Sequence, residues 1–183
     1  MKPNIRFLAV CGLVAAVFCV LGPVTVPIGP VPVSLMPLAL YVAAYVLGHR
    51  ATLVSVAVYL LLGAAGLPVF SGYQGGLAKL AGPTGGYLVG YLFLALILGL
   101  AAERSERKAL PCVIGMLAGT AVLYAFGTAW FMVETHTPLW GALTMCVLPF
   151  VPVDLCKMAV ALPVGRSTRT ALDKAQLLPG QSA

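Results

Sequence analysis

Charged residues are scarce in this sequence. Only 9% of its 183 residues are Asp, Glu, Lys or Arg, 61% are hydrophobic, and the mean hydropathy is +1.01. Because roughly a quarter of the residues in a soluble domain are charged, this composition excludes a water-soluble globular fold. The uncharged stretches include 7–48, 51–78, 80–102 and 109–133, and about 20 apolar residues suffice to cross a bilayer. The composition therefore predicts an all-α integral membrane protein.

Paired cysteines and metal-binding patterns are missing as well. The five cysteines are odd in number, contain no CxxC pair and lie inside apolar stretches. His49 and His136 lie in polar turns, at spacings that match no metal site. We therefore expect reduced cysteines that serve packing, no bound metal and no cofactor.

Catalytic and nucleotide-binding motifs are also absent from the sequence. It contains no GxSxG or HExxH pattern, so we predict no catalytic residue and do not expect an enzyme. It also lacks GxxxxGK(S/T), so active uptake would need ATP hydrolysis by another polypeptide or an ion gradient. The net charge of +6 comes from short basic clusters between hydrophobic runs, which membrane topology explains better than binding to nucleic acid.

The hydrophobic runs predict six membrane-spanning helices. Their approximate ranges are 7–22, 34–48, 51–66, 87–102, 111–131 and 139–163, within one membrane domain that covers 1–183. Prolines within 23–33 prevent helix there, and the polar tail 165–183 is expected to fray. If both termini are cytoplasmic, every Lys and Arg except Lys79 and Lys157 falls on the cytoplasmic side. We therefore expect a multi-pass protein of the cell membrane with its N- and C-termini in the cytoplasm.

The segment 67–86, LPVFSGYQGGLAKLAGPTGG, is apolar in places but is broken by glycine and proline. Irregular backbone near membrane depth persists only where it packs in protein or lines a cavity, because lipid cannot satisfy its free N–H and C=O groups. We therefore expect an extracytoplasmic Gly/Pro-rich loop that caps a site. The glycines alone are also explained by tight turns or close helix packing.

Asp154 and Lys157 are the formal charges inside a predicted span. Their i,i+3 spacing places both side chains on one face of a helix, close enough to meet. Ionisable residues at membrane depth usually face the interior of a bundle and mark a substrate or ion path. A structural salt bridge that fixes helix packing is the alternative, and the two roles are compatible.

Small residues recur at four-residue spacing in the first predicted helix, at Cys11, Gly12, Ala15 and Ala16. Such spacing lets another helix approach closely. The partner is either another helix of this chain or a separate membrane subunit.

Three segments resemble one transporter family. They are GLPVFSGYQGGLAKLAGPTGGYLVG (66–90), YAFGTAWF (124–131) and PVDLCKMAVA (152–161), and in order and spacing they are similar to the BioY family. This family comprises the biotin-specific S components of energy-coupling-factor (ECF) transporters. The likeness extends over nearly all six predicted spans, but Ser34 and Met36 stand where the family commonly has Thr and Gln.

The resemblance implies a high-affinity biotin-binding subunit, energised by a transmembrane coupling protein and two cytosolic ATPases. It assigns ligand binding to Asp154, Lys157 and the aromatic Tyr87 that closes GPTGGY. It also implies that the small residues of the first helix dock the coupling protein.

Biotin carries a ureido ring at one end and a carboxylate at the other, so residues outside the Asp154–Lys157 pair must help to bind it. The outer loop offers Phe70, Ser71 and Gln74, together with backbone N–H groups freed at Gly85 and Gly86. Two other functions stay open from the residues alone. One is an autonomous small-solute channel or facilitator without an ATPase, and the other is an intramembrane enzyme.

Overall fold

The structure is a computed structural model that describes residues 5–26 and 31–176. Its helices are α1 (Ile5–Leu21), α2 (Met36–Leu47), α3 (His49–Ala64), α4 (Leu77–Ala81), α5 (Gly85–Arg104), α6 (Ala109–Thr135), α7 (Leu139–Cys146) and α8 (Phe150–Lys174). Between α1 and α2, the strands β1 (Thr25–Val26) and β2 (Val33–Ser34) pair antiparallel, with Thr25 opposite Ser34. The mostly helical architecture that the composition predicted is confirmed.

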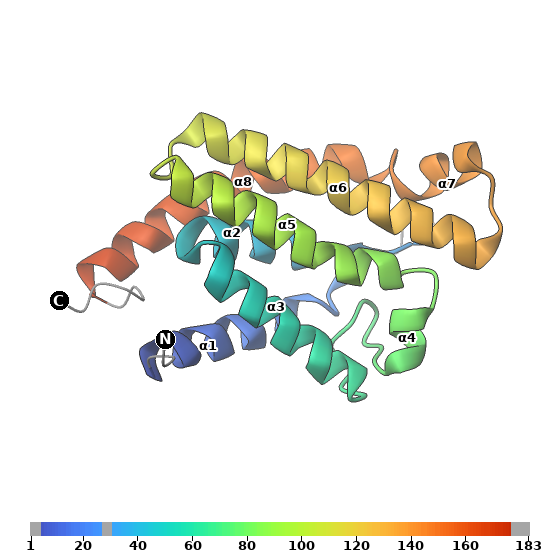
Figure 1. Cartoon of the computed structure of the whole chain (residues 1–183), viewed down its shortest axis with the longest axis horizontal. Coiled ribbons are helices and arrows are strands. Elements are labelled where there is room, and N and C mark those ends of the chain that lie inside the picture. Colours follow the sequence, from blue (N-terminus) through green and yellow to red (C-terminus); the bar gives the residue numbers. More distant parts are fainter. Residues whose placement is uncertain (1–4, 27–30, 177–183) are drawn as a thin grey trace.

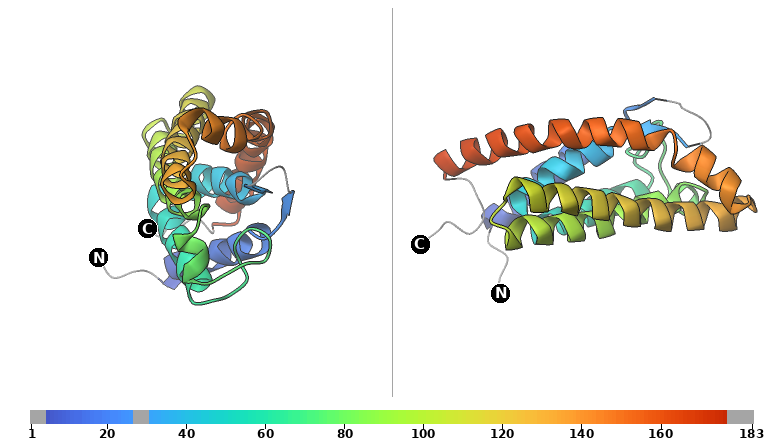
Figure 2. Two further views of the ribbon diagram at one scale, coloured as in Figure 1. Left: turned by 90° about the vertical axis from the view of Figure 1, so that its right-hand side faces the viewer. Right: turned by 90° about the horizontal axis from the view of Figure 1, so that it is seen from above.

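Helix α2 lies at the centre of the bundle. Figure 1 shows α5 and α6 side by side along their lengths, with α3 packed against α5 and α1 against α3. Helix α2 packs against α8, α5 and α3, and Figure 2 shows α8 running along the bundle beside it. Leu40, Tyr41 and Ala44 of α2 have no exposed surface, so this helix forms much of the core.

Small residues allow α5 and α6 to approach closely. A Cβ added at Gly119 of α6 would lie 2.5 Å from Cδ1 of Leu94 on α5, and one at Gly90 of α5 would lie 2.6 Å from Cδ1 of Leu123 on α6. Small residues at such crossings are how helices in lipid gain packing contacts, since burying apolar surface gives little there.

Two helices, α5 and α6, are long and apolar enough to cross a membrane, and α7 with α8 qualify together as one broken span. Helices α1, α2 and α3 are apolar but shorter. By length and composition, the described residues therefore contain two or three spans, and the topology of six spans stays a prediction.

The predicted continuous helix 139–163 is wrong. The helix is interrupted by a turn at residues 147–149, and the axes of α7 and α8 are bent by 41° relative to each other. Proline disfavours helical geometry at the residue before it, so Pro149 interrupts the helix at Leu148 and then serves as the N-cap of α8.

The expectation of a frayed tail from Gly165 onward is also wrong as far as residue 174. Helix α8 continues to Lys174, because tertiary contacts hold its last turns. The Arg169 guanidinium donates to the Val46 carbonyl, and Gly165 packs on the ring of Tyr45, where a Cβ would lie 2.8 Å from Cδ1. These contacts fix the tail against the end of α2.

The Gly/Pro-rich segment 67–86 is folded rather than extended. It contains a bridge between Phe70 and Gln74, then α4, then a turn that leads into α5. Its anchor is Phe70, which has no exposed surface and meets the ring of Tyr59 edge-on at 5.5 Å between centroids.

Candidate ligand-binding cavity

A partly enclosed cavity lies where α2, α3, α5, α6 and α8 converge with the β1–β2 hairpin. Its polar wall carries the Asp154–Lys157 pair and the hydroxyl side chains Tyr59, Ser71, Thr84, Tyr87, Tyr91 and Tyr124. Its apolar wall includes Val31, Pro32, Leu88, Leu123 and Phe150. The space open to the centres of water molecules is about 50 Å³, and one water needs ~10–15 Å³ on this measure, so the cavity has room for a few waters.

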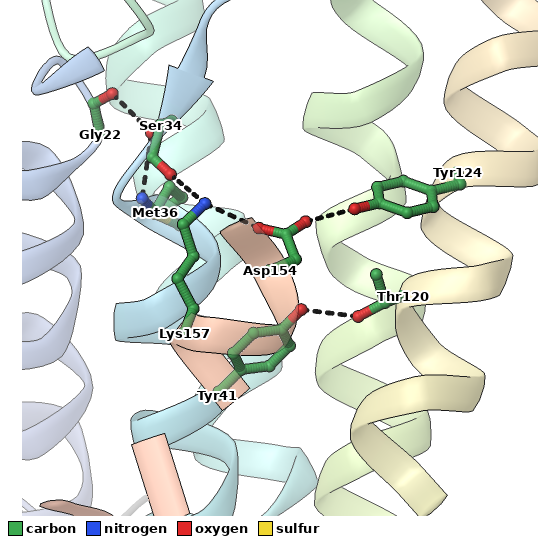
Figure 3. Close-up of polar contacts among 8 residues, drawn as sticks. All are labelled: Gly22, Ser34, Met36, Tyr41, Thr120, Tyr124, Asp154 and Lys157. Carbon is green, nitrogen blue, oxygen red and sulfur yellow. Dashed lines mark hydrogen bonds and ion pairs between the residues drawn. The ribbon is translucent and has the colours of Figure 1, made fainter. Parts of the chain in front are cut away.

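Asp154 and Lys157 form a buried ion pair on one face of α8. The Lys157 Nζ donates to Oδ1 of Asp154 at 2.7 Å, and Lys157 is 7% exposed and Asp154 4%. Tyr124 of α6 donates its hydroxyl to Oδ2 of Asp154 at 2.6 Å. Figure 3 shows the carboxylate held between these two donors. A buried charge is tolerated when it is paired and hydrogen-bonded in this way.

Lys157 also connects α8 to the hairpin. Its Nζ donates to the backbone carbonyl of Ser34 at 2.8 Å. The hydroxyl of Ser34 donates to the Gly22 carbonyl at 3.0 Å and accepts from the Met36 N–H at 3.0 Å (Figure 3). The ammonium thereby joins α8 to the end of β2 and to the first turn of α2.

Tyrosine–threonine pairs flank the ion pair. The hydroxyls of Tyr41 and Thr120 lie 2.6 Å apart (Figure 3), and those of Tyr87 and Thr128 lie 3.1 Å apart. Tyr87 also donates to the carbonyl of Cys146, at 3.4 Å, near the end of α7. These contacts fix the rings around the cavity, and Asp154 and Lys157 give it one acceptor and one cationic donor.

Four of the residues predicted for the site meet at the cavity wall. They are Asp154, Lys157, Tyr87 and Ser71, which come from α8, α5 and the segment 67–86. The structure therefore places Ser71 of the segment 67–86 and the ion pair on the wall of one cavity.

The other four predicted residues, Phe70, Gln74, Gly85 and Gly86, are not among the residues that line the cavity. Phe70 is buried against Tyr59, and Gln74 is exposed, with its backbone carbonyl accepting from the Phe70 N–H at 2.8 Å. A Cβ at Gly85 would lie 1.7 Å from the Leu80 carbonyl oxygen, and one at Gly86 would lie 2.3 Å from Cβ of Trp130. The structure gives these glycines a role in close packing.

Comparison with known proteins decides the family. The sequence profile of the BioY family matches residues 1–174. The chain belongs to the BioY family. The family resemblance found in the three sequence motifs is thereby confirmed.

Relatives of this BioY family member are named as transporters. It is 40% identical over 156 residues to the biotin transporter BioY of Thermotoga maritima, a match that covers 85% of this chain and 91% of that protein. It is 36% identical over 165 residues to the biotin transporter BioY2 of Lactococcus lactis subsp. cremoris, covering 90% and 91%. The chain is thus a membrane protein of a transporter family and not an enzyme, as the missing catalytic motifs predicted.

A solved structure shares the fold of this BioY family member. The crystal structure of the S-component for biotin from an ECF-type ABC transporter superposes with a TM-score of 0.82 at 29% identity. The match covers 91% of this chain and 92% of the other.

The small residues of α1 divide into two faces. Cys11 and Ala15 are each 2% exposed, and the Cys11 thiol donates to the Ala51 carbonyl of α3 at 3.7 Å. Gly12 and Ala16 are exposed, and a Cβ at Gly12 would meet nothing within 4 Å. The first two residues therefore pack within this BioY family member, and the other two form an outward face of small side chains.

Sequence reasoning missed Tyr124, Ser34 and Thr84 at the cavity. A signal for Tyr124 was present, because Thr120, Tyr124 and Thr128 recur every four residues and make a polar stripe on an apolar helix. Ser34 contacts Lys157 through its backbone carbonyl. Every residue has such a carbonyl, so the residue type does not indicate this contact.

Proposed function

We propose that this chain is the biotin-binding S component of an ECF-type uptake transporter. The observation that carries the proposal is the buried Asp154–Lys157 pair facing a cavity, in a chain whose relatives are named biotin transporters. A separate transmembrane coupling protein and two cytosolic ATPases supply the energy, since the sequence has no nucleotide-binding loop of its own.

In this proposal, the chain is one domain with six spans, and both termini are cytoplasmic. Helix α2 has 12 residues and is ~18 Å long, shorter than the ~30 Å hydrocarbon core. Because most of its residues are buried in the bundle, its ends meet protein rather than lipid, and a short helix is sufficient. The segment 67–86 then caps the cavity on the outer side.

The ion pair suits the ureido ring better than the carboxylate. Asp154 and Lys157 neutralise each other, so the pair presents no net charge to attract an anion. The carboxylate of Asp154 accepts hydrogen bonds and the ammonium of Lys157 donates them, and the ureido group offers N–H donors and a carbonyl acceptor in one small ring. The proposed contacts therefore run from ureido N–H to Asp154 and from Lys157 to the ureido oxygen.

Biotin needs more room than the cavity provides. Pockets for ligands of this kind measure ~300 Å³ or more, so binding requires wall segments to move outward. Val31 and Pro32 beside β2, and Ser71 in the segment 67–86, line the cavity from outside the helices, and we propose that these segments move. Ser71 and Tyr87 then contact the ligand, whereas Phe70, Gln74, Gly85 and Gly86 hold the loop in place.

The outward face of α1 is the proposed docking surface for the coupling protein. Gly12 and Ala16 are exposed one turn apart, so a partner helix can approach the backbone closely there. Cys11 and Ala15 lie on the opposite, buried side of α1, where α1 packs against α3.

Equilibrium binding of biotin to the purified chain in detergent tests the proposal. The wild-type chain should bind biotin tightly, and Lys157→Met should weaken binding at least tenfold, because a buried hydrogen bond to a charged group contributes ~1.5–3 kcal/mol. Lys174→Met, the same change at the exposed end of the same helix, is the control and should bind normally. Absence of biotin binding by the wild-type chain would contradict the proposed function.

A further inference from the structure

One buried hydroxyl at the cavity lacks a partner. In residues 5–26 and 31–176, the side-chain oxygen of Thr84 is the buried polar atom for which no hydrogen bond is found. A buried polar group without a partner destabilises the folded state, so such groups are rare in folded proteins. Thr84 also lines the cavity that contains Asp154 and Lys157.

The local structure of the helix end does not use this hydroxyl. Thr84 is the N-cap of α5, a position where a Thr side chain normally accepts from the backbone N–H two or three residues later. Here it makes no such bond, because its backbone is helical, with φ −94° and ψ −1°. Its backbone carbonyl instead accepts from the N–H groups of Tyr87 at 3.2 Å and Leu88 at 3.4 Å.

The turn that carries Thr84 is held firmly. The Gly82 carbonyl accepts from the Trp130 indole N–H at 3.0 Å and from the Gly85 N–H at 2.9 Å. Gly86 lies against the same Trp130, where even a methyl group would not fit. The backbone that carries Thr84 is therefore held in place before a ligand binds, which lowers the entropy lost on binding.

Thr84 lies at a different level of the bundle from the ion pair. Tyr124 of α6 contacts Asp154, and Trp130 of α6 contacts the turn at Gly82. These contacts are six residues apart, which corresponds to ~9 Å along the helix. When one polar end of a ligand binds Asp154 and Lys157, this separation means that only the opposite end of the ligand can reach Thr84.

The position also favours an anion. Thr84 stands at the N-terminus of α5, a helix of 20 residues, where the helix dipole and the first backbone N–H groups create positive potential. We propose that the Thr84 hydroxyl donates a hydrogen bond to the carboxylate of the bound ligand and so selects for acidic vitamins of this length. This inference rests on the proposed function, because it takes the ligand to be biotin with its ureido ring at the ion pair.

A comparison that varies both residue 84 and the ligand tests the inference. Thr84→Val removes the hydroxyl and keeps the shape, and Thr84→Ser keeps the hydroxyl. Each is titrated with biotin and with an analogue that ends in a methyl group instead of the carboxylate. Thr84→Val should bind biotin about tenfold more weakly, because the lost hydrogen bond has a charged acceptor. The same variant should bind the methyl analogue as the wild type does, and Thr84→Ser should bind biotin within about threefold of the wild type.

The thermal stability of the variants without ligand separates binding from folding. Thr84→Val should unfold at the wild-type temperature or above it, since it removes an unpartnered buried hydroxyl. Wild-type biotin affinity in Thr84→Val, or an equal loss for both ligands, would overturn the inference and leave the proposed function intact. Failure of the wild-type chain to bind biotin would instead overturn the proposed function.

Discussion

Removing Lys157 should damage both folding and binding, and a second substitution should separate the two effects. In Lys157→Met, the Asp154 carboxylate keeps Tyr124 as a donor but loses its cation while it is only 4% exposed. Breaking a buried pair in this way costs ~3–5 kcal/mol. For a chain of this size, that corresponds to a fall of about 10 °C in the unfolding temperature.

The double variant Asp154→Asn/Lys157→Met removes the stranded charge. The introduced asparagine would keep an oxygen that accepts from the Tyr124 hydroxyl, and the introduced methionine would fill the volume of the lysine stem. Most of the lost stability should therefore return, because replacing a buried pair by neutral groups is often close to neutral. Biotin binding should stay weak, since the ureido oxygen loses its cationic donor and the ureido N–H groups lose their charged acceptor.

Two measurements on the same purified samples check this reasoning. Thermal unfolding without biotin reports the stability, and equilibrium titration reports the affinity. If the double variant unfolds as early as Lys157→Met, the cost does not come from an uncompensated charge. If the double variant binds biotin as the wild type does, the ion pair is structural only.

Three further predictions follow from packing and hydrogen bonding. Tyr124→Phe should weaken biotin binding about tenfold and also lower the unfolding temperature, because the buried Asp154 carboxylate loses a charge-assisted hydrogen bond; unchanged affinity in a titration would contradict this. Gly119→Val should lower the unfolding temperature, because the added side chain would collide with α5. Gly12→Val adds a side chain in open space, so it should unfold at the wild-type temperature but should not co-purify with the coupling protein. Co-purification of Gly12→Val at the wild-type level would exclude the docking face. Arg169→Ala should speed hydrogen exchange in the last two turns of α8, and Arg166→Ala should not; equal exchange would show that the Val46 contact does not hold the tail.

Much of the helical architecture could be predicted from the sequence. Five of the six predicted helices match α1, α2, α3, α5 and α6 to within a few residues at each end, because hydrophobic runs and Pro/Gly breaks are local signals. The meeting of Asp154 and Lys157 was also local, since residues three apart on a helix share a face.

The failures at the C-terminal end have a common cause. Helix α8 continues past Gly165 because Arg169 and Tyr45 hold it against α2, and those contacts join residues more than a hundred positions apart. A polar composition near the end of a chain carries no sign of such contacts, so fraying was the natural expectation. The break at Pro149 was visible as a proline in the sequence, but the apolar run on both sides of it concealed the bend.

Composition and local patterns are enough to show that this chain is helical and apolar, lacks catalytic and nucleotide-binding motifs, and carries one acid and one base inside its last hydrophobic run. The surroundings of that pair depend on how distant segments pack in space. The carbonyl of Ser34 and the hydroxyl of Tyr124, which bond the pair, come from two distant segments, and the Thr84 hydroxyl farther along the cavity comes from a third. Hydrogen bonds depend on distance and direction in space, and the packing of α5, α6 and α8 around α2 sets both.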